Sequence, residues 1–163
     1  EHGYSKLTAR ELAKYIGCST GPIFKNYENF DMYKEDLKFY LRKDYSSFIY
    51  KYVDIKDYLY TISYAYAFYA KKEPNAFFSL FMADLAGSRT VEEVLNTDRN
   101  FETIEAMVKQ YNITLEEAKR VYREVRFYTH GIATQLCVNS IKLTDREIKD
   151  LIRNNIEINL RRN

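Results

Sequence analysis

The sequence is poor in the residues that several protein classes depend on. Its 163 residues include only two prolines, five glycines, two cysteines and no tryptophan. Scarce glycine and proline leave little room for a turn-rich β architecture, and charged residues recur between apolar ones at helical intervals. The sequence therefore predicts an all-α fold.

Residues that bind metals or form disulfides are also few. Cys18 and Cys137 lie far apart and match no spacing of metal ligands. They fit reduced thiols in a cytosolic protein, although the sequence leaves an oxidised pair open. His130 has no cysteine or histidine at a metal-site spacing, so a structural histidine is favoured over a ligand. We predict no metal site and no cofactor.

Signatures of membrane insertion and catalysis are missing as well. No uninterrupted apolar run reaches membrane-spanning length and no signal peptide is visible, so a cytoplasmic protein without a membrane partner is expected. The chain has no phosphate-cradling glycine-rich loop, no His-Glu-x-x-His pair and no nucleophile signature. We therefore do not expect an enzyme. The formal net charge of +2 says little about partners.

Aromatic residues are abundant by contrast, with 16 tyrosines and 10 phenylalanines. Most should pack in a core, where the tyrosine hydroxyls need partners or water. A second interpretation is an apolar cavity with a few polar handles, in which a small molecule could bind. The candidate wall residues are Tyr66, Phe78, Phe81, Met82, Phe101 and Tyr128. For each of them alone, core packing is the favoured alternative.

Residues 7–27 carry a helix-turn-helix pattern. Thr8 followed by Glu11 forms a capping box, in which each residue satisfies a free amide of the other. A first helix should therefore start at about Ala9.

A second, shorter helix should follow directly. Gly17 can adopt the positive φ of a tight turn, and Ser19 can cap a helix over residues 20–26. Pro22 is tolerated there because an amide in the first turn has no intrahelical partner. Small and polar groups at a helix start suit a DNA groove and phosphates. The alternative is an ordinary pair of helices around a glycine turn.

This segment resembles the DNA-binding domain of the TetR/AcrR family of bacterial transcriptional regulators. The family pattern is Thr-x-x-x-Ile-Ala, three residues, then Gly-Val-Ser-x-Gly-Thr-Leu-Tyr-x-His-Phe. It lies over Thr8, Leu12-Ala13, Gly17-Cys18-Ser19, Gly21-Pro22-Ile23-Phe24 and Asn26-Tyr27. Residues 127–133 also resemble the aromatic-His-Gly segment in the penultimate helix of many members.

The resemblance implies a helix-turn-helix DNA-binding domain with a connecting helix at residues 1–50, and a helical ligand-binding and dimerisation domain at 51–163. It implies a homodimer, most often a repressor, whose operator affinity falls when a small-molecule effector changes the spacing of the two heads. The implied residues near double-stranded DNA are Thr8, Ser19, Thr20, Gly21, Pro22, Ile23, Lys25, Asn26 and Tyr27. The implied dimer residues are Ile132, Leu136, Leu151, Ile152 and Asn155, for which an intramolecular core role is the alternative.

The chain departs from the family in three ways. Phe24 replaces a tyrosine whose hydroxyl usually meets a phosphate, and Phe30 stands where a lysine usually begins the fourth helix. The family's first helix would precede this sequence, since residues 1–4 align with its end. These departures leave another class open, namely a helical coactivator or interaction protein of the same fold with weak or no direct DNA binding.

Seven further helices are expected after residue 27. Most start at a cap residue or at a proline that breaks the preceding pattern. The starts are Asn29, Asp54, Glu73-Pro74, Thr90 with Glu93, about Asn100, Thr114 with Glu117, and Thr144 with Glu147. The third of these helices should end at Gly87-Ser88.

Overall fold

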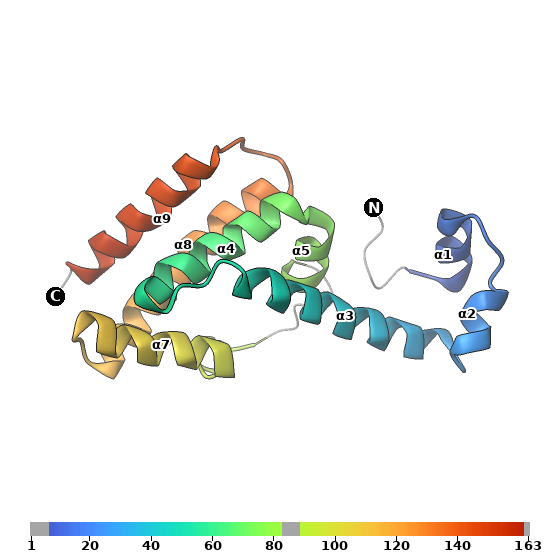
Figure 1. Ribbon diagram of the computed structural model, residues 1–163, viewed down its shortest axis with the longest axis horizontal. Coiled ribbons are helices and arrows are strands. Elements are labelled where there is room, and N and C mark those ends of the chain that lie inside the picture. Colours follow the sequence, from blue (N-terminus) through green and yellow to red (C-terminus); the bar gives the residue numbers. More distant parts are fainter. Residues whose placement is uncertain (1–6, 83–88, 162–163) are drawn as a thin grey trace.

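The computed structural model describes residues 7–82 and 89–161, and within these ranges every regular element is a helix (Figure 1). The all-α prediction is therefore confirmed. The elements are α1 (Ala9–Ile16), α2 (Gly21–Asn26), α3 (Phe30–Tyr50), the 3-10 turn η1 (Ile55–Asp57), α4 (Tyr58–Lys72), α5 (Pro74–Phe81), α6 (Val91–Leu95), α7 (Asp98–Tyr111), α8 (Leu115–Cys137) and α9 (Asp145–Leu160). The helix end predicted at Gly87-Ser88 and the alignment of residues 1–4 lie outside the described residues.

Capping residues set most helix starts. The capping boxes predicted at Thr8, Thr90, Thr114 and Thr144 all form, each with the hydroxyl accepting the amide of the glutamate three residues on. Helix α7 differs from the prediction, because it starts at Asp98 rather than near residue 100 and its N-cap makes no side-chain hydrogen bond. Short-range capping interactions thus set where most of the helices begin.

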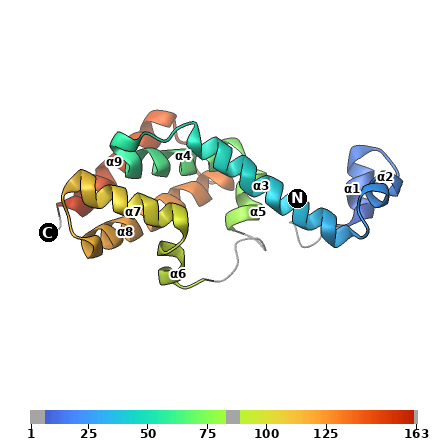
Figure 2. The ribbon, with the colours of Figure 1, turned by 60° about the horizontal axis from the view of Figure 1, so that its bottom comes forward.

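The helices form a small head and a larger bundle joined by α3. We call α1 and α2 the head and α4 to α9 the body. Figure 1 shows α3 running from the head to the body, and Figure 2 shows the same separation after rotation. In the body, α4 packs along α8, and both helices contact α7 and α9. The fully buried side chains at this centre are Leu59, Ile104, Met107, Val121, Val125, Ile148 and Ile152.

Three of the five predicted dimer residues belong to this core instead. Ile132 and Leu136 of α8 are 7% and 8% exposed, and Ile152 of α9 is fully buried. They face the inside of their own bundle, so they are not available to a second copy, and the dimer prediction is wrong for these three. Leu151 and Asn155 are half-buried and remain candidates.

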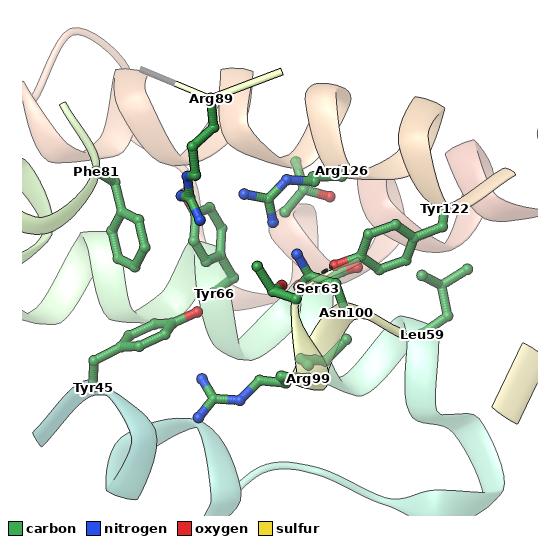
Figure 3. Close-up of a pocket in the computed structure, with 13 residues that line it drawn as sticks. Tyr45, Leu59, Ser63, Tyr66, Phe81, Arg89, Arg99, Asn100, Tyr122 and Arg126 are labelled. Carbon is green, nitrogen blue, oxygen red and sulfur yellow. Dashed lines mark hydrogen bonds between the residues drawn. The ribbon is translucent and has the colours of Figure 1, made fainter. Parts of the chain in front are cut away.

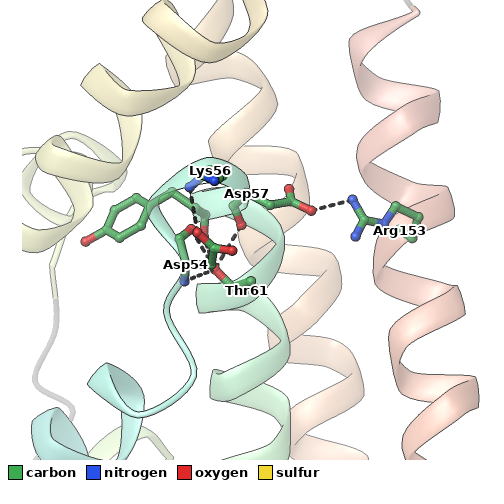
Figure 4. A network of polar contacts seen from close by, with 6 residues as sticks. Asp54, Lys56, Asp57, Thr61 and Arg153 are labelled. Carbon is green, nitrogen blue, oxygen red and sulfur yellow. Dashed lines mark hydrogen bonds and ion pairs between the residues drawn. The ribbon is translucent and has the colours of Figure 1, made fainter.

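A polar network fixes the junction between α3, α4 and α9 (Figure 4). Asp54 caps η1 by accepting the Lys56 amide at 2.9 Å, as its cap position predicts. The Thr61 hydroxyl donates to the Asp57 carbonyl at 2.8 Å and accepts the Asp54 amide at 3.0 Å. Arg153 of α9 reaches the Asp57 carboxylate at 2.6 Å. The start of α4 is thereby tied to the last helix.

Candidate functional site

The head is built around a left-handed turn. Gly17 ends α1 with φ +74°, a conformation that side chains with a Cβ rarely adopt. The Cys18 amide donates to the Ala13 carbonyl at 2.9 Å, which closes the turn. The turn predicted from the glycine is confirmed.

The start of α2 differs from the prediction in two respects. The N-cap is Thr20 rather than Ser19, and it makes no side-chain hydrogen bond because its backbone is already helical, with φ −73° and ψ −13°. Ile23 is only 7% exposed and packs inward, so the prediction that it faces DNA is wrong. The Asn26 amide group donates to the Pro22 carbonyl at 2.8 Å, which uses part of its bonding capacity within the helix.

The other candidate DNA residues lie mostly on the surface. The exposed residues are Thr8, Ser19, Gly21, Pro22, Lys25 and Asn26, while Thr20 and Tyr27 are half-buried. The Tyr27 hydroxyl donates to Asp36 at 3.1 Å, and this bond is the main reason that the pKa of Tyr27 is raised. Tyr27 also meets Tyr33 edge to face, with ring centroids 5.3 Å apart. It therefore attaches α2 to α3.

The exposed surface of the head is basic and partly aromatic. Arg10, Lys14 and Lys25 are all exposed. Phe24 is 50% exposed and Tyr15 is 91% exposed, and both project from the two short helices. The cations suit a phosphate backbone, whereas the two rings provide apolar contact area.

The body contains a cavity of about 250 Å³ at the meeting point of α3, α4, α5, α7 and α8 (Figure 3). This volume is slightly below the range of about 300–1,000 Å³ that is typical of ligand sites. The lining residues are Tyr45, Leu59, Ile62, Ser63, Tyr66, Phe81, Arg89, Thr97, Arg99, Asn100, Tyr122, Arg126 and Thr129. The wall of the cavity thus combines aromatic and aliphatic side chains with arginines and hydroxyl groups.

Several polar groups of the wall are held by hydrogen bonds. The Tyr122 hydroxyl donates to Asn100 Oδ1 at 2.7 Å, and Asn100 Nδ2 donates to the Val94 carbonyl at 2.6 Å. Burial raises the pKa of Tyr122, and the nearby charge of Arg126 partly opposes that rise. The phenol is therefore neutral and stays a hydrogen-bond donor.

His130 lies beside the cavity as a partner of Tyr66. The Tyr66 hydroxyl and His130 Nδ1 are 2.8 Å apart. Burial, and then the charge of Arg126, lower the pKa of His130. A neutral imidazole can accept the tyrosine proton at Nδ1, so this histidine has a structural partner.

Only part of the predicted ligand set lines this cavity. Tyr66 and Phe81 do, whereas Phe78, Met82, Phe101 and Tyr128 line none of the described cavities. Phe78 is 40% exposed and Tyr128 is 38% exposed, because each lies on the outer side of its helix. The prediction that these four residues bind a ligand is not supported.

Sequence reasoning missed the polar half of the wall. Arg99 and Asn100 come from α7, and Tyr122, Arg126 and Thr129 come from α8. The three α8 residues follow one another at steps of four and three, so they share one helix face. A search for polar residues at the spacing of the apolar stripe could have found them.

Other kinds of site have little support in the described part of the chain. No group of three or more His, Cys, Asp or Glu residues there could hold a metal ion. No helix within residues 7–82 and 89–161 combines the length and the apolar character needed to cross a membrane. No protein-family model, curated protein or solved structure matches the chain. The family resemblance therefore remains a prediction that rests on residues 8–27 and 127–133.

Proposed function

We propose that the protein is a ligand-responsive, DNA-binding transcriptional regulator of the cytoplasm, acting as a homodimer and most simply as a repressor. One observation carries the proposal: α3 holds two short helices with an exposed basic surface at one end and forms part of a cavity wall at the other (Figures 1 and 3). The head and the cavity of the body are thus connected by one helix, α3. No catalytic role is proposed.

DNA contact would use the exposed side of α2. Lys25 and the small residues Gly21 and Pro22 lie on the outside of this helix, so a duplex could approach its backbone closely. Lys25, with Arg10 and Lys14 of α1, would contact phosphates, and such contacts supply most of the affinity. Ile23 would hold α2 against the head from the inside.

A second copy would place a second head on the same duplex. The outer side of α8 exposes Phe127 (58%), Tyr128 (38%) and Val138 (54%), and α9 exposes Ile158 (52%). Together with Leu151, these side chains give the dimer a more accessible apolar surface than the three buried residues can. Two heads related by a two-fold axis would read two half-sites in successive major grooves.

The decisive experiment measures DNA binding by the full-length protein over a range of salt concentrations. Duplexes selected by the protein from a random pool serve as ligands, alongside the promoter region of its own operon. Lys25→Ala should weaken binding to all selected duplexes and reduce the slope of log K against log[salt] by about 1, as expected for one lost phosphate contact. Binding is followed by fluorescence anisotropy.

The matched control is Lys109→Ala, which removes the same charge from an exposed position on α7 of the body. It should leave both the affinity and the salt slope unchanged. No enrichment of any duplex at low salt, or equal effects of the two lysine variants, would refute DNA binding by this head.

A helical coactivator or interaction protein is the second candidate. The exposed rings of Tyr15 and Phe24 favour it, because they offer apolar contact area on the head where a phosphate contact would need a hydroxyl group or a cation. In that case the head would bind another protein subunit. Duplex selection would then fail, while Phe24→Ala would abolish binding to that subunit.

A further inference from the structure

The charge of the body cavity is one-sided. Arg89, Arg99 and Arg126 line it, and none of its described lining residues is an aspartate or glutamate. Figure 3 shows Arg89 and Arg126 entering from one side and Arg99 from the other. No described carboxylate forms an ion pair with any of the three. Arg99 and Arg126 are half-buried and Arg89 is exposed at the rim. Half-buried cations without a carboxylate make a site with a strong preference for negative charge.

Arg99 is held in position by its neighbours. Its Nη2 donates to the Ser46 hydroxyl at 2.8 Å, and its guanidinium lies 5.6 Å from the ring centroid of Tyr45 and 5.3 Å from that of Tyr50. Its Nε is buried and has no hydrogen-bond partner among the described residues. The side chain is therefore oriented before any ligand binds, which lowers the cost of binding.

Neutral donors complete the polar side of the cavity. Thr129 is only 2% exposed, and its hydroxyl oxygen has no partner within the described part of the chain. Ser63, 7% exposed, is a second hydroxyl in the same wall. A buried polar group without a hydrogen-bond partner in a native protein is usually explained by a bound ligand, a bound water or a functional role. Carboxylate and phosphate oxygens accept hydrogen bonds from both hydroxyl groups and guanidinium groups.

A second cavity of about 290 Å³ adjoins the first and shares Tyr66, Phe81, Arg89 and Arg126 with it. Its remaining wall consists of five apolar residues, His130, and Arg123, whose charge is paired with Glu124 at 3.3 Å. The apolar residues are Leu80, Val91, Val94, Leu95 and Phe127. Arg126 thus lies between the two cavities, and the second cavity offers a continuous apolar stretch of wall beside its cations.

We propose that the body binds a small amphipathic anion, with its carboxylate or phosphate group between Arg99 and Arg126 and its apolar part in the adjoining cavity. Neutral and cationic molecules of the same shape leave the arginines without a counter-charge and bind poorly. That this anion acts as an effector rests on the proposed regulatory function. Binding itself is measured without DNA, so the two proposals fail independently.

The test uses the full-length protein and a matched set of octyl probes: octanoate, octyl phosphate, octanol and octylamine. Isothermal titration calorimetry below the micelle concentration of each probe gives the dissociation constants. We expect saturable binding of at least one anion, and at least about tenfold weaker binding of the alcohol and the amine, since hydrogen bonds to charged groups contribute most of the discrimination. The tighter anion identifies the preferred head group.

Arg126→Gln separates ligand binding from structural support. It should weaken binding of the anion by about tenfold to a hundredfold and leave octanol binding unchanged. The unfolding temperature of the free protein should hardly change, because no described ion pair is lost and a glutamine amide can still hydrogen-bond to Tyr122. Arg146→Gln, the control, makes the same charge change at a side chain of α9 that is 91% exposed. It should alter none of these values.

Three results would overturn the proposal. One is that neither anion binds, and another is that octanol binds as tightly as octanoate. The third is that Arg126→Gln lowers the unfolding temperature while the affinity for the anion stays the same, since that pattern belongs to a purely structural arginine.

Discussion

Ile152→Ala is the sharpest test of where the interior of this protein lies. Ile152 is fully buried in the core shared by α4, α8 and α9. The change removes three carbon atoms, or about 2.4 kcal/mol of transfer free energy at about 0.8 kcal/mol each, and leaves a cavity besides. We expect the free energy of unfolding to fall by about 3–4 kcal/mol, measured by urea denaturation followed by circular dichroism.

The control is Ile158→Ala, six residues farther along the same helix, where the side chain is 52% exposed. In the monomer, Ile158→Ala should lower the free energy of unfolding by less than about 0.5 kcal/mol, whereas in the proposed dimer, where Ile158 lies on the contact surface, the loss should grow with protein concentration. The cost of Ile152→Ala should not depend on protein concentration, because the lost contacts are intramolecular. A loss below about 1 kcal/mol, or a loss that vanishes as the protein is diluted to monomer, would show that Ile152 lies at a subunit interface after all.

Three further changes address the head, a junction and the cavity rim. Phe24→Tyr should tighten DNA binding about twofold to tenfold by adding a phosphate hydrogen bond, measured by anisotropy. Arg153→Ala should cost about 1 kcal/mol in urea denaturation, because its ion pair with Asp57 is partly exposed to solvent. The pKa of His130 in the folded protein lies below its ordinary value of 6.5. The neutral ring therefore contributes its full stabilisation of the fold above pH 6.5, and this contribution is lost as the pH falls below that value. His130→Asn should therefore flatten the acid side of the stability profile, measured by urea denaturation at several pH values.

Helix starts could be predicted because their signals are local. A threonine and a glutamate three residues apart satisfy each other's free backbone groups whatever lies around them. Thr8, Thr90, Thr114 and Thr144 all do so. Ser19 failed as a cap because Thr20 already has helical backbone angles and α2 is only six residues long. Short helices offer too few residues for their ends to be fixed by sequence alone.

The cavity could not be predicted because it depends on which helix faces meet. Periodicity shows that Ile132 and Ile152 lie on apolar stripes, but an apolar stripe can be covered by its own chain or by a copy. Here both pack inward. Arg99 and Arg126 are 27 positions apart and reach one cavity only because α7 and α8 pack together. Aromatic residues alone therefore pointed to the right region but not to the arginines that line it.

The physical link between cavity and head is α3. Tyr45 of this helix lines the cavity and the adjacent Ser46 accepts a hydrogen bond from Arg99, while Tyr27 fastens the head to Asp36 nearer the other end. A ligand can shift the head only by binding one arrangement of α3 more tightly than another. A hundredfold change in operator affinity needs about 2.7 kcal/mol of such coupling, and one hydrogen bond to a charged group, made in one arrangement and lost in the other, supplies about 1.5–3 kcal/mol. In the proposed regulator, a single altered contact to Arg99 would therefore be enough near the upper end of that range.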